Sequence, residues 1–109
     1  MMVLPIGLDR TISDTFGDDL FDAPGRPLTV RVALIRLLEV TKSPNTEATD
    51  LRLKLLHLPE GSEVETAEAR LLCEVVAENA RGYARLVTDS LHEYVEPISA
   101  ELKAAKTPA

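Results

Sequence analysis

Four stretches of this chain carry apolar residues at steps of three and four, and prolines or glycines interrupt the chain between and beside them. This spacing places the apolar side chains on one face of an α-helix. A short helix cannot bury such a face alone, so the four helices are expected to pack against each other. The pattern predicts an all-α fold, a small bundle of about four helices in a domain spanning residues 29–97. The stretches themselves are 27–40, 47–58, 62–79 and 83–97.

The residues available for a core support this fold class. Apolar residues make up 45% and charged residues 28% of the 109 residues, which is the balance of a single folded globular domain. Only four residues are aromatic and none is tryptophan, so the core must be built from Leu, Val, Ile and Ala. Such a mixture favours packed helices.

The sequence pattern leaves two alternatives open for both the first and the last helix. Thr29 is placed to cap the first helix, although the β-branched residues within 30–40 also permit a strand there. Pro97 closes the fourth helix or starts a short extension. Beyond it, residues 98–109 are expected to form a helical tail that frays.

The second and third helices have clearer boundaries. Pro59 prevents the second helix from continuing, and Gly61 supplies the chain reversal that follows. Thr66 is the expected N-cap of the third helix, with Glu68 in its first turn, where a carboxylate matches the helix dipole. The surrounding acidic cluster is expected to be solvated and not catalytic or calcium-binding. Its members are Glu60, Glu63, Glu65 and Glu68.

The N-terminal segment differs in composition from the rest of the chain. Residues 1–28 hold three of the seven prolines and three of the five glycines, which hinder regular structure. Five aspartates against two arginines give this segment a net charge of −3, half of the chain's −6. We predict an irregular or flexible acidic arm over residues 1–28, preceding the helical domain.

The charge balance and the lack of targeting signals narrow the classes of partner. A net charge of −6 repels phosphate backbones and anionic lipid, so a direct nucleic-acid or membrane partner is not expected. No stretch approaches the ~18 consecutive apolar residues of a membrane span. The single cysteine, Cys73, lies in an apolar stretch and is expected to be a buried thiol in a reducing cytoplasm.

The sequence carries no recognisable catalytic or cofactor motif. It contains no glycine-rich phosphate loop, no G-x-S-x-G elbow and no HExxH. A zinc site would need Cys73, His57 and His92 to meet by chance packing, since none of them has ligand spacing in the sequence. We therefore expect a protein that is not an enzyme and binds no metal or cofactor.

One short segment, "GDDLFD", resembles a linear docking motif. In such motifs apolar anchors enter a partner's groove while flanking charges steer the encounter. Its last residues also match the Asp-Leu-Phe end of the bacterial sliding-clamp binding pentapeptide, although Gly17 stands where that motif has glutamine. Alternatively, Phe16 and the Leu-Phe pair fold back over an open edge of the bundle. The predicted partner-binding residues are Asp18, Asp19, Leu20, Phe21 and Asp22.

The order of the helical stretches resembles small helical accessory proteins encoded by tailed bacteriophages and prophages. The resemblance spans residues 28–96 and is carried by "LTVRVALIRLL", "LRLKLLHL", "VETAEARLLCEVVAENA" and "YARLVTDSLHEYV". It implies a viral accessory or assembly role and transfers no site residue. The predicted function is a protein-binding module that regulates or inhibits a host or viral protein. The alternative is an assembly subunit of a phage particle that forms a homo-oligomer through its arm and helix faces.

Overall fold

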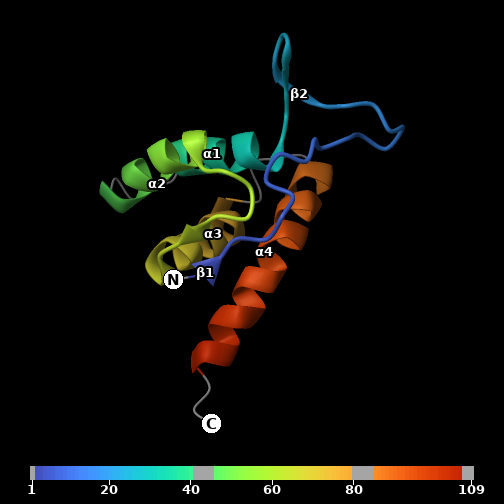
Figure 1. Ribbon diagram of the computed structural model, residues 1–109. Helices are drawn as coiled ribbons and strands as arrows, with labels where there is room; N and C mark the ends of the chain where they lie inside the picture. Colours follow the sequence, from blue (N-terminus) through green and yellow to red (C-terminus); the bar gives the residue numbers. More distant parts are fainter. Residues whose placement is uncertain (1, 41–45, 80–84, 107–109) are drawn as a thin grey trace.

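The computed structural model describes residues 2–40, 46–79 and 85–106 and is mostly helical (Figure 1). Three of its helices start and end within one residue of the stretches predicted from the apolar pattern or inside them, and the last helix runs further than predicted. Two small antiparallel sheets accompany the helices. The fold is therefore mostly helical, but it is not the all-α fold that the apolar pattern predicted. The helices are α1 (Val30–Val40), α2 (Thr46–His57), α3 (Thr66–Asn79) and α4 (Arg85–Lys106), and the strands are β1 (Met2–Val3), β2 (Phe21–Ala23), β3 (Arg26–Pro27) and β4 (Glu63–Val64).

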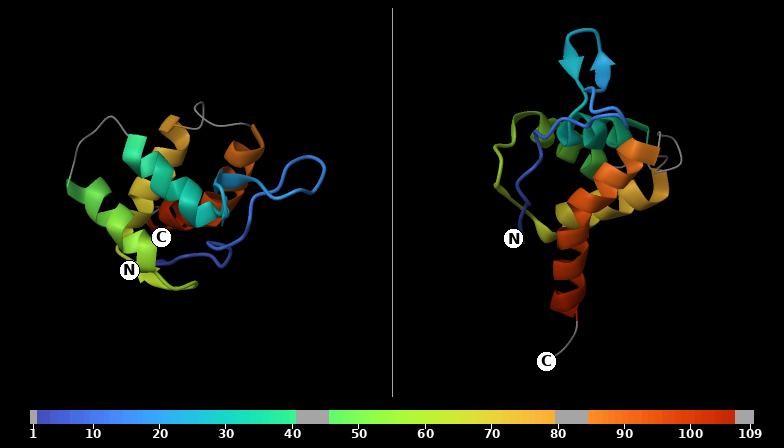
Figure 2. Two further views of the ribbon diagram at one scale, coloured as in Figure 1. Left: turned by 90° about the horizontal axis from the view of Figure 1, so that it is seen from above. Right: turned by 90° about the vertical axis from the view of Figure 1, so that its right-hand side faces the viewer.

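Helix α1 lies at the centre of the bundle and confirms the helical interpretation of residues 30–40. It packs against α2 and also contacts α3 and α4, while α3 and α4 pack against each other (Figure 2). The Thr29 hydroxyl accepts a hydrogen bond from the Val32 N–H at 3.2 Å, which is the expected N-cap. Tertiary burial of one face outweighs the β-propensity of its branched residues. The buried residues of α1 include Val30, Ala33, Leu34, Leu37 and Leu38.

Residues 2–28 are part of the folded body, which corrects the prediction of an arm outside it. Strand β1 pairs with β4, with Met2 opposite Val64 and Val3 opposite Glu63. Prolines and glycines do interrupt regular structure here, but the apolar residues between them are positioned to reach the helices. The segment contributes Met2, Leu4, Leu8, Ile12 and Leu28 to the core, each less than 10% exposed.

Three backbone hydrogen bonds form a closed ring where this segment meets α1. The Ile12 N–H donates to the Leu28 carbonyl at 2.8 Å, and the Leu28 N–H donates to the Leu20 carbonyl at 2.7 Å. The Leu20 N–H completes the ring by donating to the Ile12 carbonyl at 2.9 Å. All three side chains pack in or against the core. The ring therefore fixes the chain at both ends of the segments 13–19 and 21–27.

The connection from α2 to α3 follows the predicted stop signals but not the predicted cap. Helix α2 ends before Pro59, and Gly61 has φ +71°, a left-handed conformation that favours glycine. Helix α3 already includes Thr66, so the capping position is Glu65, one residue earlier than predicted. The Glu68 carboxylate accepts the Glu65 N–H at 3.0 Å, as in one half of a capping box.

Helix α4 continues through Pro97 to Lys106, which corrects the prediction of a frayed tail over residues 98–109. Proline removes one backbone hydrogen bond inside the helix. The helix nevertheless persists because Ile98 and Leu102, on the same stripe as Leu91, are buried in the core. The end of the predicted tail, residues 107–109, lies outside the described residues.

A candidate protein-binding surface on two projecting segments

Two neighbouring segments project from the helical body and carry most of the predicted site. We name residues 13–19 the Phe16 loop and residues 21–27 the β2–β3 hairpin. Figures 1 and 2 show both extending beyond the helices from a shared base. That base is the ring of hydrogen bonds formed by Ile12, Leu20 and Leu28.

The Phe16 loop is a hydrogen-bonded turn built around Asp14. One carboxylate oxygen of Asp14, Oδ1, accepts the N–H of Phe16 at 2.9 Å and the N–H of Asp18 at 3.0 Å. The Asp14 N–H donates to the Asp18 carbonyl at 2.8 Å, and Gly17 takes the positive φ of +85° that closes the turn. Phe16 is held at the tip with 89% of its surface exposed.

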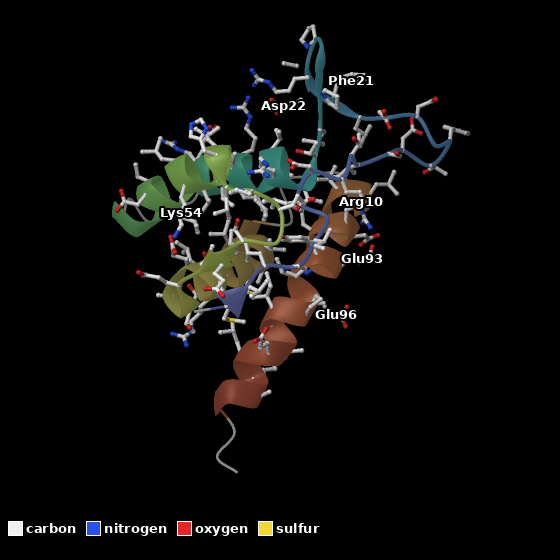
Figure 3. The ribbon with its side chains drawn as sticks, viewed as in Figure 1. Arg10, Phe21, Asp22, Lys54, Glu93 and Glu96 are labelled. Carbon is white, nitrogen blue, oxygen red and sulfur yellow. The ribbon has the colours of Figure 1, made fainter. Side chains whose placement is uncertain are left out.

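The β2–β3 hairpin places Phe21 and Asp22 on opposite sides of one strand (Figure 3). Phe21 is 61% exposed. Asp22 faces α1, where its two carboxylate oxygens accept bonds from Nε and Nη2 of Arg36 at 3.0 and 2.8 Å. Arg26 of β3 adds a longer contact at 3.4 Å. The hydrogen bonds and charges of these arginines outweigh the effect of burial and lower the pKa of Asp22.

The structure separates the five residues predicted as a docking motif. Asp18 and Asp19 are exposed on the Phe16 loop, and Phe21 is exposed on the hairpin. Leu20 packs against the core and Asp22 is held by arginines, so neither is free to enter a partner's groove. The alternative in which all three apolar residues fold back holds for Leu20 only.

Phe16 is the candidate anchor that the motif interpretation did not select. It is more exposed than Phe21 and lies beside the exposed aspartates of the same loop. The segment "DTFGDD" contained a local signal for the exposure of Phe16. An aspartate three residues before a glycine is typical of a turn, and the central residues of a turn face solvent. What the sequence did not reveal is that Leu20 packs against the core.

The acidic cluster near α3 is partly structural and not simply solvated. The Glu60 carboxylate accepts the N–H of Leu8 at 2.8 Å and those of Gly7 and Asp9 at 3.3 Å, which binds the N-terminal segment to the α2–α3 connection. Glu68 pairs with Lys54 of α2 at 2.9 Å.

Cys73 and His92 line one groove between α3 and α4, together with Glu96, whereas His57 lies exposed on α2. Burial and the neighbouring Glu74 raise the pKa of the Cys73 thiol, which disfavours the reactive thiolate. Within residues 2–40, 46–79 and 85–106, no three His, Cys, Asp or Glu side chains are grouped closely enough to hold a metal ion.

No family model, no curated protein and no solved structure matches the chain. In the part of the chain that the structure describes, no helix combines the length and apolar character needed to cross a lipid bilayer.

Proposed function

We propose that this chain is a non-enzymatic protein-binding module that contacts its partner through the Phe16 loop and the β2–β3 hairpin. Phe16 and Phe21 are the apolar anchors, and Asp18 and Asp19 are the steering charges. The observation that carries the proposal is the exposure of two phenylalanines, 89% and 61%, on backbone that is fixed by hydrogen bonds.

This arrangement suits binding for two physical reasons. Aromatic side chains contribute a large share of binding energy when they enter a partner's pocket, because they bury much apolar surface with few rotatable bonds. The Asp14 turn and the hairpin also order these side chains before contact, which reduces the entropic cost of association. The neighbouring aspartates favour a partner surface rimmed by basic residues.

The resemblance to phage accessory proteins supports a host or viral protein as the partner. A regulatory or inhibitory role requires only that the bound surface overlap one that the partner needs. The module itself then needs no catalytic group or cofactor.

The test is photo-crosslinking from the tip of the loop. Phe16 is replaced by a benzophenone-bearing phenylalanine, and the matched control carries the same group at Glu101, an exposed position on α4. We expect adducts of defined mass from position 16 and not from position 101. Adducts with a different protein should disappear when unlabelled wild-type chain is added and should persist when the double variant Phe16→Ala, Phe21→Ala is added.

The competitor must remain folded for this comparison to be valid. Both phenylalanines are exposed, so the double variant should keep the thermal unfolding midpoint of the wild type. Leu20→Ala is unsuitable as a competitor, because Leu20 packs against the core. Equal adducts from both positions, or equal competition by the double variant, would contradict the proposed surface.

A further inference from the structure

A second surface feature lies on the other side of the hairpin from the Phe16 loop. It is a groove of about 310 Å³ where the hairpin meets α1 and α2. In Figures 1 and 2 these two helices lie on one side of the hairpin and the Phe16 loop on the other. The groove is lined by Arg26, Val32, Ile35, Arg36, Glu39 and Leu56.

The groove combines an apolar floor with a rim on which cations are more exposed than anions. Val32 and Ile35 of α1 and Leu56 of α2 supply the floor, and Leu56 is 51% exposed. On the rim, the side chains of Arg26 and Arg36 are 60% and 39% exposed. The carboxylates that they contact are less exposed, at 34% for Glu39 and 11% for Asp22.

The Phe16 loop has the complementary properties. Residues 13–19 carry three aspartates and no basic residue, and they present one phenylalanine at the tip. Grooves of ~300 Å³ and more accommodate groups larger than a phenyl ring. The chain therefore contains both an acidic aromatic projection and an apolar groove with an arginine rim.

We infer that the groove receives the Phe16 loop of a second copy of this chain. Phe16 would lie on Val32, Ile35 and Leu56, while Asp18 and Asp19 approach Arg26 and Arg36. This inference rests on the proposed function and names the partner for the same surface. It identifies the contact through which the chain would act as an assembly subunit.

The geometry makes this contact head-to-tail. The loop and the groove are different surfaces on opposite sides of the hairpin, so binding one copy leaves a free groove at one end and a free loop at the other. Such a heterologous contact continues into an open chain of copies or closes into a ring. A two-fold symmetric dimer would instead use both surfaces of each copy at once.

Two variants that each destroy one half of the contact provide the test. Phe16→Ser removes the anchor, and Leu56→Glu places a carboxylate on the groove floor. The matched control is Leu53→Glu, which makes the same change on the same helix at a residue that is 53% exposed and does not line the groove. Sedimentation velocity measures the mass distribution of each variant alone and of equimolar mixtures.

We expect the wild type and Leu53→Glu to assemble with increasing concentration. Phe16→Ser and Leu56→Glu should each remain monomeric, with apparent affinity weakened roughly 30-fold or more. Their equimolar mixture should form dimers and nothing larger, because only the loop of the groove variant and the groove of the loop variant are intact. Unchanged thermal midpoints will show that both variants are folded.

Three sedimentation results would overturn the inference. The first is a wild type that stays monomeric up to about 1 mM, which is the weak end of specific association. The second is assembly that survives in both variants, and the third is a mixture that does not form dimers. If Phe16 crosslinks only to a different protein, the proposed function stands while self-recognition fails. If position 16 gives no specific adduct at all, both fail.

Discussion

At the scale of single residues, exposure separates side chains that hold the fold from side chains available for binding. Leu8 and Phe16 lie in the same N-terminal segment, and the sequence pattern does not distinguish a buried from an exposed apolar residue there. Leu8 is 1% exposed and Phe16 is 89% exposed. Opposite consequences are therefore expected when each is truncated.

We predict that Leu8→Ala lowers the free energy of unfolding by about 3 kcal/mol, because it leaves a cavity in the core. Phe16→Ala should change that free energy by no more than about 0.5 kcal/mol, because its ring contacts mainly solvent. Urea denaturation followed by circular dichroism measures both. Similar, small effects for the two variants would mean that the N-terminal segment contributes little to the core.

At the scale of elements, the start of α3 depends on a carboxylate with two structural roles. Glu68 accepts the Glu65 N–H and pairs with Lys54 of α2, so it both caps its helix and links it to another. Burial alone would raise its pKa. The bonds from Lys54 and Glu65 and the charge of Lys54 outweigh burial, and the pKa lies below its ordinary 4.5.

This direction predicts how stability responds to acid. A pKa lowered by folding means that the contribution of Glu68 is present above pH 4.5 and is lost as pH falls through the lower, folded-state value. Wild type should exceed Glu68→Gln in unfolding free energy at pH 7, and the difference should shrink steadily below pH 4.5. Glu63→Gln, at an exposed position on β4, is the control and should show little difference from wild type at either pH. A pH-independent difference between wild type and Glu68→Gln would contradict the assignment.

At the scale of the whole molecule, the N-terminal segment and the helices share one core. Residues 2–28 are joined to it by β1–β4 pairing, by the Glu60 contacts and by the ring through Ile12, Leu20 and Leu28. No separate apolar cluster is found for this segment among the described residues. Segments that share a core unfold together.

We predict that the amide protons of Ile12, Leu20 and Leu28 exchange with solvent only through global unfolding. Native-state hydrogen exchange by NMR at increasing urea should give these amides the same opening free energy as core amides of α1. The Asp19 amide, on the projecting loop, serves as the comparison and should exchange faster. If the Ile12 amide exchanged near the rate of an unfolded peptide, the N-terminal segment would be an arm detached from the core, and this prediction would be wrong.

The helices of this protein were largely predictable from the order of its residues. The three-and-four spacing of apolar residues located α1 to α4, Thr29 marked the first cap, and Pro59 with Gly61 marked the end of α2. These features are local: they depend on helix geometry and on the conformational limits of proline and glycine. The sequence by itself therefore determined the helical class of the body and most helix boundaries.

Only the tertiary structure decided which side chains of the N-terminal segment are available for binding. Leu20 and Phe21 are adjacent and equally apolar, yet one packs against the core and the other faces solvent. The difference arises from the backbone hydrogen bonds that join Leu20 to Ile12 and Leu28 and place its side chain against the core, and the apolar pattern does not encode it. Local patterns also do not encode the ion pair of Asp22 with Arg36 or the hydrogen bond from the Leu8 N–H to the Glu60 carboxylate. The continuation of α4 past Pro97 is a third example. In each case burial or charge pairing with a distant element outweighs the local preference, so the candidate surface became definable only once the chain was folded.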